Sequence, residues 1–239
     1  MTNEPRGVAV VSGAGSGIGR EIALALARRG HPLALLGRRK ALLEQTLAVA
    51  GGAVEDGLVL PCDVRDADSV AAAARDVERR WGAAALVVPA AGLAAIAPLE
   101  ETAPDRFRDV LATNLTGTFL LLHALLPGMK RRGSGWIFPI LSTAAQRGFP
   151  GWSAYCASKW GLAGLIAALR EELRGTGVRV TTLFPGATDS PLWDDLPGDW
   201  NRALMVPPRE VARAVVNALE SDPSTLIEEI HLGPVGGAL

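Results

Sequence analysis

The sequence of 239 residues is poor in several residue types that mark common classes of protein. It has two cysteines, Cys62 and Cys156, which stand alone and predict neither a disulfide framework nor a metal site built on cysteine pairs. Its net charge is −1, so it lacks the excess of basic residues that favours nucleic acid or an anionic membrane as a partner. We therefore expect no metal, no nucleic acid and no membrane among its ligands.

Long apolar runs are also missing. Residues 1–6 contain no apolar run and so do not resemble a signal peptide. The longest apolar run, residues 119–126, is interrupted by His123 and is shorter than the roughly 20 residues that cross a bilayer. Apolar residues nevertheless make up 49% of the chain, which is ample material for a core. These features predict a cytoplasmic protein in a reducing compartment.

Short apolar runs alternate with helical patterns along the whole chain. Strands are expected at residues 7–11, 33–36, 58–60, 85–88, 136–141, 178–184 and 226–232, and helices at residues 20–29, 41–50, 66–81, 104–132, 156–173 and 208–219. Short strands that are apolar throughout and alternate with helices predict a parallel sheet covered on both faces. The predicted fold class is α/β, with one doubly wound, Rossmann-type domain over residues 1–239 and a parallel seven-stranded sheet.

A glycine-rich segment follows the first expected strand and leads into the first expected helix, with the spacing Gly13-x-x-x-Gly17-x-Gly19. Glycines at this place let the backbone approach a pyrophosphate, whose charge is favoured by free N–H groups and by the helix dipole. The alternative is a simple tight turn; a P-loop is excluded because no Lys-Ser/Thr pair follows the glycines. We predict a dinucleotide phosphate site at Gly13, Gly15, Ser16, Gly17, Ile18 and Gly19.

The end of the second expected strand indicates which dinucleotide binds. An NAD site has an acidic residue there that bonds the ribose 2′-hydroxyl, but this strand ends in Gly37-Arg38-Arg39. Guanidinium groups suit a 2′-phosphate, because they donate charge-assisted hydrogen bonds to it. We predict that NADP(H) is preferred, that NAD(H) remains possible, and that Arg38 and Arg39 contact the phosphate. The alternative is that both arginines merely begin the next helix.

Tyr155 is the only tyrosine of the chain, and Lys159, one of three lysines, follows it by four positions. The residues after this pair have a helical pattern, so both side chains share one helical face. A neighbouring cation favours the phenolate of a tyrosine, and lowering its pKa from about 10 to about 7–8 takes roughly 3–4 kcal/mol. The pair is a candidate acid/base unit, and the alternative is a surface pair at helical spacing.

The glycine spacing and Tyr155-x-x-x-Lys159, in a chain of this length, resemble the short-chain dehydrogenase/reductase family over essentially the whole sequence. The resemblance implies that residues 1–132 form mainly the cofactor half. Residues 133–239 would then hold the catalytic helix, the substrate loop and the C-terminal strand. It implies a catalytic group of four residues, Asn114, Ser142, Tyr155 and Lys159, and further cofactor contacts at Asp63, Val64, Ala91, Gly92, Tyr155, Lys159, Pro185, Gly186 and Thr188.

The implied reaction interconverts a carbonyl and an alcohol, with the nicotinamide exchanging a hydride. Tyr155 would be the general acid in reduction and the general base in oxidation, while Ser142 would bond the same substrate oxygen. Lys159, together with the charge of the oxidised nicotinamide, would lower the pKa of Tyr155 and would also bind the nicotinamide ribose. Asn114 would position a water that connects Lys159 to solvent.

Two prolines depart from the family pattern. Pro89 begins the segment Pro89-Ala90-Ala91-Gly92, where the family has Asn-Ala-Gly, so the hydrogen bonds of that asparagine must be replaced or lost. Pro139 lies inside the fifth expected strand and removes one ladder donor. Both prolines are expected near the ends of adjacent central strands, close to the cofactor. The sequence is compatible with a local rearrangement of the backbone at these prolines and equally with substitutions that have no structural consequence.

In the family, the loops after the later strands form the substrate pocket. In this chain those loops offer a mainly apolar lining, with Leu93, Arg147, Phe149, Trp152 and Trp193 as the expected pocket residues. The expected substrate is a small, mainly apolar carbonyl or alcohol compound. Arg147 is either a ligand for an anionic substituent or an exposed surface arginine.

The expected helix 156–173 is apolar nearly all round, which one sheet contact does not bury. Together with the resemblance, this predicts a homodimer or a homotetramer. A catalytically silent, dinucleotide-binding sensor of the same fold is the main alternative function. An epimerase of the longer branch would need a larger C-terminal domain, and a hydrolase would need a G-x-S-x-G elbow, which the sequence lacks.

Overall fold

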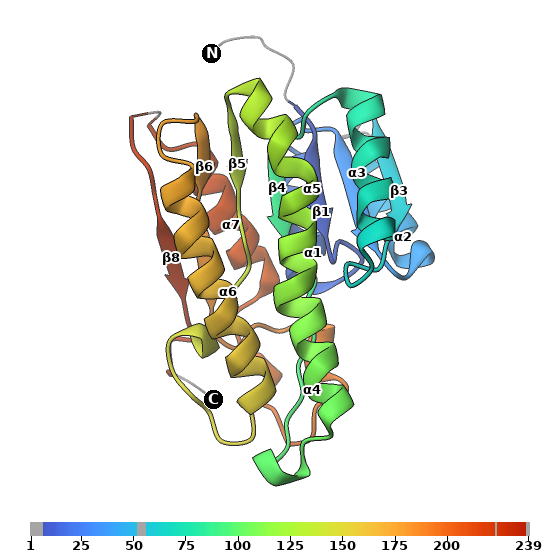
Figure 1. Ribbon diagram of the computed structural model, residues 1–239. Coiled ribbons are helices and arrows are strands. Elements are labelled where there is room, and N and C mark those ends of the chain that lie inside the picture. The colour runs from blue at the N-terminus through green and yellow to red at the C-terminus, as the bar shows by residue number, and fades with distance from the viewer. Residues whose placement is uncertain (1–6, 52–55, 223, 238–239) are drawn as a thin grey trace.

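The computed structural model describes residues 7–51, 56–222 and 224–237. A central parallel sheet has the strand order β3-β2-β1-β4-β5-β6 (Figure 1). Its strands are β1 (Ala9–Ser12), β2 (Leu33–Gly37), β3 (Gly57–Pro61), β4 (Leu86–Pro89), β5 (Gly135–Ile137) and β6 (Val178–Val180). The order reverses between β1 and β4, and such a reversal is where ligands bind in open α/β sheets. The expectation about a signal peptide falls on residues 1–6, outside the described residues.

Helices cover both faces of this sheet, as expected (Figure 1). One layer holds α1 (Gly17–Ala27), α2 (Lys40–Ala50) and α7 (Pro208–Leu219), and the other holds α3 (Ala67–Trp81), α5 (Gly117–Arg132) and α6 (Ser153–Glu172). Alternate residues of β2 divide between the layers: Leu33 and Leu35 pack in the core beneath α1, whereas Ala34 and Leu36 pack in the core beneath α5 and α6. The apolar runs of the sequence are therefore buried on both sides, and the predicted Rossmann-type α/β fold is confirmed.

The expected seven-stranded sheet needs a correction, because the main sheet has six strands. The expected strand 178–184 divides into β6 and β7 (Thr182–Pro185), and β7 forms a separate parallel pair with β8 (Glu229–Leu232). Pro139 gives the physical reason. The N–H groups of Phe138 and Ile140 donate to β4, so the missing N–H of Pro139 falls on the β6/β7 side and interrupts that ladder. Among the described residues, a bridge between Ile140 and Leu183 connects the β7/β8 pair to the main sheet.

The long helix expected at 104–132 is interrupted near its middle. It consists of α4 (Pro104–Leu111), a π-helical turn at Ala112–Thr116, and α5. By length and mean hydropathy alone, Pro104–Arg132 is one stretch among the described residues that could cross a membrane. In the fold, its apolar side chains Leu121, Leu125 and Met129 are buried in the core beneath α5 and α6. A π-helical turn inside an α-helix often marks a functional position.

The turns after α5 and α6 approach each other closely. Two glycines after α6 allow the effect of backbone strain to be measured separately from the effect of this close approach. Gly175 and Gly177 both have φ of +78°, but a Cβ on Gly177 would lie 2.0 Å from the carbonyl oxygen of Gly133, whereas a Cβ on Gly175 meets nothing within 4 Å. We expect Gly175→Ala to lower the free energy of unfolding by about 1 kcal/mol through backbone strain. Gly177→Ala should cost about 1–3 kcal/mol more through the added clash. Urea unfolding of both variants measures the difference, and equal losses would contradict the close approach.

Candidate active site

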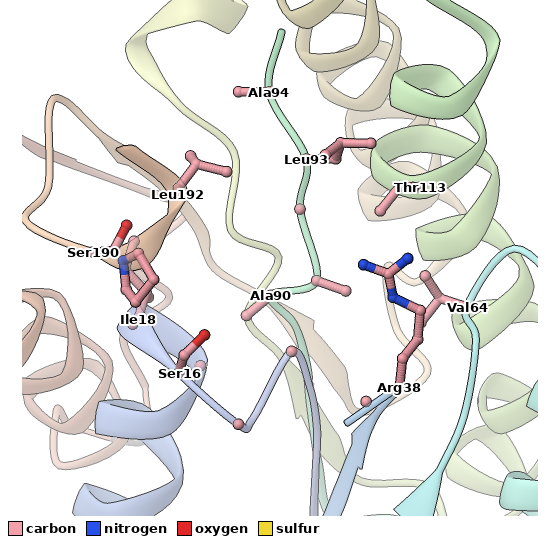
Figure 2. Close-up of a pocket in the computed structure, with 18 of the residues that line it drawn as sticks. Ser16, Ile18, Arg38, Val64, Ala90, Leu93, Ala94, Thr113, Ser190 and Leu192 are labelled. Atoms are coloured by element: carbon pink, nitrogen blue, oxygen red, sulfur yellow. The ribbon is translucent and has the colours of Figure 1, made fainter. Parts of the chain in front are cut away.

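A cavity of about 560 Å³ lies at the carboxyl ends of the central strands (Figure 2). Its walls come from the glycine-rich segment after β1, the end of β2, the segments after β3 and β4, and helix α6. Nearly all of the predicted phosphate and adenosine contacts line it: Gly13, Gly15, Ser16, Gly17, Ile18, Gly19, Arg38, Arg39, Asp63, Val64, Ala91 and Gly92. The structure therefore brings together, at the strand-order reversal, residues that are up to 79 positions apart in the sequence.

The glycine-rich segment is shaped to hold an anion. Helix α1 begins at Gly17, Ser16 makes no side-chain cap, and the first turn contains no acidic residue, so its N–H groups remain available to a ligand. A Cβ on Gly13 would lie 2.8 Å from the carbonyl oxygen of Ala90, and one on Gly19 would lie 2.5 Å from that of Gly13. Only glycines allow this path of the backbone. The residues present therefore fit the diphosphate of a dinucleotide.

Arg38 and Arg65 line this cavity near the carboxyl ends of β2 and β3. Arg38 extends from the end of β2, and its guanidinium lies between Ala90 and Val64 (Figure 2). Arg65, which the sequence did not single out, donates to the carboxylate of Asp63 from Nε and Nη2, at 3.0 and 2.7 Å. This pairing holds the pKa of Asp63 below its usual range. Arg65 also bonds Asp109 at 3.1 Å, a contact between residues distant in the sequence that no local pattern reveals.

The segment Pro89-Ala90-Ala91-Gly92, which departs from the family pattern, is held by backbone hydrogen bonds to its neighbours. The hydroxyl of Ser12, at the end of β1, accepts from the backbone N–H groups of Ala90 and Ala91, at 3.1 and 3.3 Å. The carbonyl of Pro89 accepts from the N–H of Ile140 at 3.1 Å, so Pro89 stays within the ladder as an acceptor. The hydroxyl of Ser12 thus satisfies two backbone donors beside the cavity wall.

A second cavity, of about 530 Å³, adjoins the first. Ser142, Tyr155, Pro185, Gly186 and Thr188 line it, together with four of the five expected substrate residues, Arg147, Phe149, Trp152 and Trp193. The fifth, Leu93, lines the first cavity instead. Tyr155 lines both cavities, as do Ile18, Leu141, Ser190 and Leu192. Trp200 and Ser190 also line this cavity, as expected of a loop after a later strand, although neither is among the individually predicted site residues.

Helix α6 buries both members of the Tyr155–Lys159 pair. Burial raises the pKa of Tyr155 to about 12, although the neighbouring Ser142 hydroxyl opposes the change. Burial also lowers the pKa of Lys159 to about 8. The ammonium of Lys159 donates to the carbonyl of Ile140 at 2.9 Å and lies 5.6 Å from the centre of the Tyr155 ring. Burial therefore shifts both groups towards their neutral forms, and Lys159, with a pKa of about 8, is still mainly an ammonium at pH 7.

Asn114 lies in the π-helical turn and is fully buried, outside the lining of both cavities. Its side-chain oxygen accepts from the N–H of Leu93 at 2.8 Å, and its nitrogen donates to the carbonyl of Leu93 and to the hydroxyl of Ser158, both at 2.9 Å. The side chain thus connects three elements: the segment after β4, the interrupted helix and α6. On α6 its side chain bonds Ser158, one residue before Lys159.

The buried ammonium of Lys159 has a measurable consequence for stability. Its pKa is about 8 in the folded protein against 10.5 as a free group, so the unfolded state binds more protons between these pH values and stability rises with pH. We expect the Lys159→Met variant to have a higher free energy of unfolding than the native protein, with the largest difference below pH 8. This difference should shrink by up to about 3 kcal/mol as the pH rises towards 10.5.

Denaturant unfolding from pH 7 to pH 10 measures that difference. Lys130→Met removes a solvent-exposed ammonium from the end of α5 and serves as the control for a lost lysine charge. A difference between native protein and Lys159→Met that stays constant over this range would show that burial does not penalise the ammonium.

Comparison with known proteins agrees with this geometry. Residues 7–199 match the family described as short chain dehydrogenase. The sepiapterin reductase of Chlorobaculum tepidum is 37% identical over 96% of this chain and 97% of its own. The D-threitol dehydrogenase of Mycolicibacterium smegmatis is 38% identical over 96% and 92%. An alcohol dehydrogenase from Thermococcus sibiricus, solved with 5-hydroxy-NADP, is 33% identical and superposes with a TM-score of 0.89 over 96% of this chain and 97% of its own. The chain belongs to the short-chain dehydrogenase/reductase family and is an NAD(P)-dependent oxidoreductase.

Proposed function

We propose that the protein is an NADP(H)-dependent oxidoreductase that interconverts a carbonyl and an alcohol on a small, mainly apolar substrate. The observation that carries this proposal is the position of Tyr155, whose side chain lines both the dinucleotide-sized cavity and the adjoining apolar cavity. A proton donor at that junction reaches the substrate oxygen at the place where a cofactor and a substrate meet. The relatives, a sepiapterin reductase and a D-threitol dehydrogenase among them, support the reaction class.

NADP(H) would bind along the first cavity and supply or accept the hydride. The glycine-rich segment and the first turn of α1 would hold its diphosphate, and Arg38 and Arg39 its 2′-phosphate. Asp63 and Val64 would contact the adenine, while Ala91 and Gly92 would border the cofactor further along. Pro185, Gly186 and Thr188 line the second cavity beside Tyr155, where they would cover the nicotinamide. The absence of an acid at the end of β2 and the Thermococcus sibiricus relative with a bound NADP derivative support the choice of NADP(H).

Four residues would carry the proton chemistry. Tyr155 protonates the substrate oxygen in reduction, and Ser142 bonds the same oxygen and orients it. Burial raises the pKa of Tyr155 to about 12, so the phenol is neutral in the protein alone, and proton donation would require a nearby positive charge to stabilise the phenolate that forms. Lys159 holds its ammonium beside the Tyr155 ring, and its charge becomes favourable once the phenolate forms. Asn114 fixes Ser158 and the segment at Leu93, and in our proposal also positions a water next to Lys159.

The remaining features of the proposal concern the whole molecule. We propose one domain over residues 1–239, acting in the cytoplasm as a homodimer or homotetramer. Trp160 on α6 and Phe119 on α5 support an assembly, because they are 53% and 46% exposed on helices whose opposite sides are buried. Large apolar side chains that remain exposed on neighbouring helices are typical of subunit contacts.

The cofactor preference is tested by titrating the protein with NADPH and NADH and following fluorescence. We expect NADPH to bind at least tenfold more tightly, about 1.4 kcal/mol, because Arg38 pairs with the 2′-phosphate. Arg38→Ala should remove most of this preference. Lys40→Ala is the matched control, since Lys40 is a nearby cation that pairs with Glu44 and does not line the cavity. Equal affinity for both dinucleotides in the native protein would overturn the assignment of Arg38.

The role of Tyr155 is tested by Tyr155→Phe, which removes only the hydroxyl. We expect turnover of carbonyl substrates with NADPH to fall by about 10²–10⁴, because the proton donor is lost, while NADPH still binds. Ser153→Ala is the control: it removes a nearby hydroxyl of α6 that has no hydrogen-bond partner among the described residues. A Tyr155→Phe protein with native turnover would favour the silent, dinucleotide-binding alternative.

A further inference from the structure

The second cavity has walls suited to a flat ring. Trp152 packs edge-on against Tyr155 and Trp193, with ring centres 5.5 and 5.7 Å apart, and Trp200 lies 4.9 Å from Trp193. The indole N–H of Trp193 donates to the carbonyl of Thr188 at 2.9 Å, which fixes the orientation of its ring. Rigid aromatic walls of this kind favour a planar aromatic guest, which they contact by stacking or edge-to-face packing.

The same cavity carries a single formal charge among its described lining residues, and that charge is positive. Arg147 lines the cavity, is exposed, and stacks its guanidinium on Phe149 at 4.9 Å from the ring centre. No described acidic residue forms an ion pair with Arg147. Its charge is therefore available at the opening of the cavity, and the stack on Phe149 holds it in place.

Two carboxylates of the segment that covers the site are paired within that segment. Arg202 donates to Asp189 at 2.6 Å and to Asp194 at 2.9 Å, and also to the backbone carbonyl of Ser190. Neither of these carboxylates lines the second cavity. Aromatic walls alone could equally hold a quaternary ammonium group. The free guanidinium of Arg147 would repel such a cation and attracts an anion.

We propose that the substrate is an aromatic carbonyl compound with an anionic group, such as a carboxylate, on the part of the ring system away from the carbonyl. The proposal rests on the proposed function and deepens it by naming the substrate class. The carbonyl lies at Tyr155 and Ser142, the ring lies among Trp152 and its neighbours, and the anionic group pairs with Arg147. In reduction the carbonyl carbon gains the hydride of NADPH and the oxygen gains the proton of Tyr155. The anionic group is unchanged.

A matched pair of aldehydes tests the charge preference. 4-Formylbenzoate and its methyl ester have the same ring and the same carbonyl, and only the first carries a negative charge. With NADPH at low ionic strength, we expect kcat/KM to favour 4-formylbenzoate by about three- to fivefold, the upper range for a pair with an exposed arginine. The preference should appear mainly in KM and should decrease with added salt.

Variants of Arg147 assign the preference to this side chain. Arg147→Ala should bring the ratio of the two kcat/KM values to about one, and Arg147→Glu should reverse it. Arg75→Ala is the control, because Arg75 is an exposed arginine of α3 that lines neither cavity, and it should keep the native ratio. A native protein that reduces both aldehydes equally well, with the same ratio in Arg147→Ala, would overturn the proposal.

A binding measurement separates this inference from the proposed function. Three tryptophans line the cavity, so the binding of 4-formylbenzoate quenches tryptophan fluorescence whether or not the aldehyde is reduced. If the protein reduces neither aldehyde but shows quenching that Arg147→Ala abolishes, the result supports the anion site at Arg147 and contradicts the proposed reduction of aromatic aldehydes. If neither reduction nor Arg147-dependent quenching occurs, the anion site is wrong.

Discussion

The buried ammonium of Lys159 is the constraint on which the site depends. It donates to the carbonyl of Ile140, and that carbonyl is free because the ladder between β4 and β5 ends there. In a continued parallel ladder the N–H of Ala91 would be the partner of Ile140, but this N–H donates to the hydroxyl of Ser12 instead. One hydroxyl at the end of β1 therefore releases the acceptor that a buried lysine needs. Without such an acceptor, an ammonium in this position would carry the full cost of lost hydration.

Desolvation also defines how the two titrating groups act together. A tyrosine with a pKa of about 12 and a lysine with a pKa of about 8 both resist charge in the protein alone. A negative charge on Tyr155 would be stabilised by the Lys159 ammonium at short range in a poorly screened environment, so each group makes the charged form of the other less costly. The charge on Lys159, which lines the first cavity, therefore affects how readily Tyr155 can carry a negative charge.

The sequence predicts the architecture and most of the site, and the differences have physical causes. Apolar runs that alternate with helical patterns are enough to predict a parallel, doubly covered sheet. The glycine spacing predicts the turn after β1 that lines the first cavity, because only glycines allow the close approach at Gly13 and Gly19. The division of the expected strand 178–184 could not be predicted, because the effect of Pro139 depends on which neighbouring strand its missing N–H would face. The π-helical turn at Asn114 does not change the spacing of apolar residues in the sequence, so that spacing does not predict it. The pairing of Arg65 with Asp109 depends on tertiary folding.

The segment after β7 belongs to both cavities at once. Ser190 and Leu192 line the two cavities, and a Cβ on Gly17 would lie 3.0 Å from that of Ser190, so this segment rests directly on the phosphate-binding turn. Within this segment, Arg202 forms ion pairs with Asp189 and Asp194, which connect its beginning to its end. A displacement of this segment would therefore change the lining of both cavities at once. If each cavity holds a ligand, as we propose, a ligand that shifts this segment would change the affinity for the other ligand by the same factor in both directions.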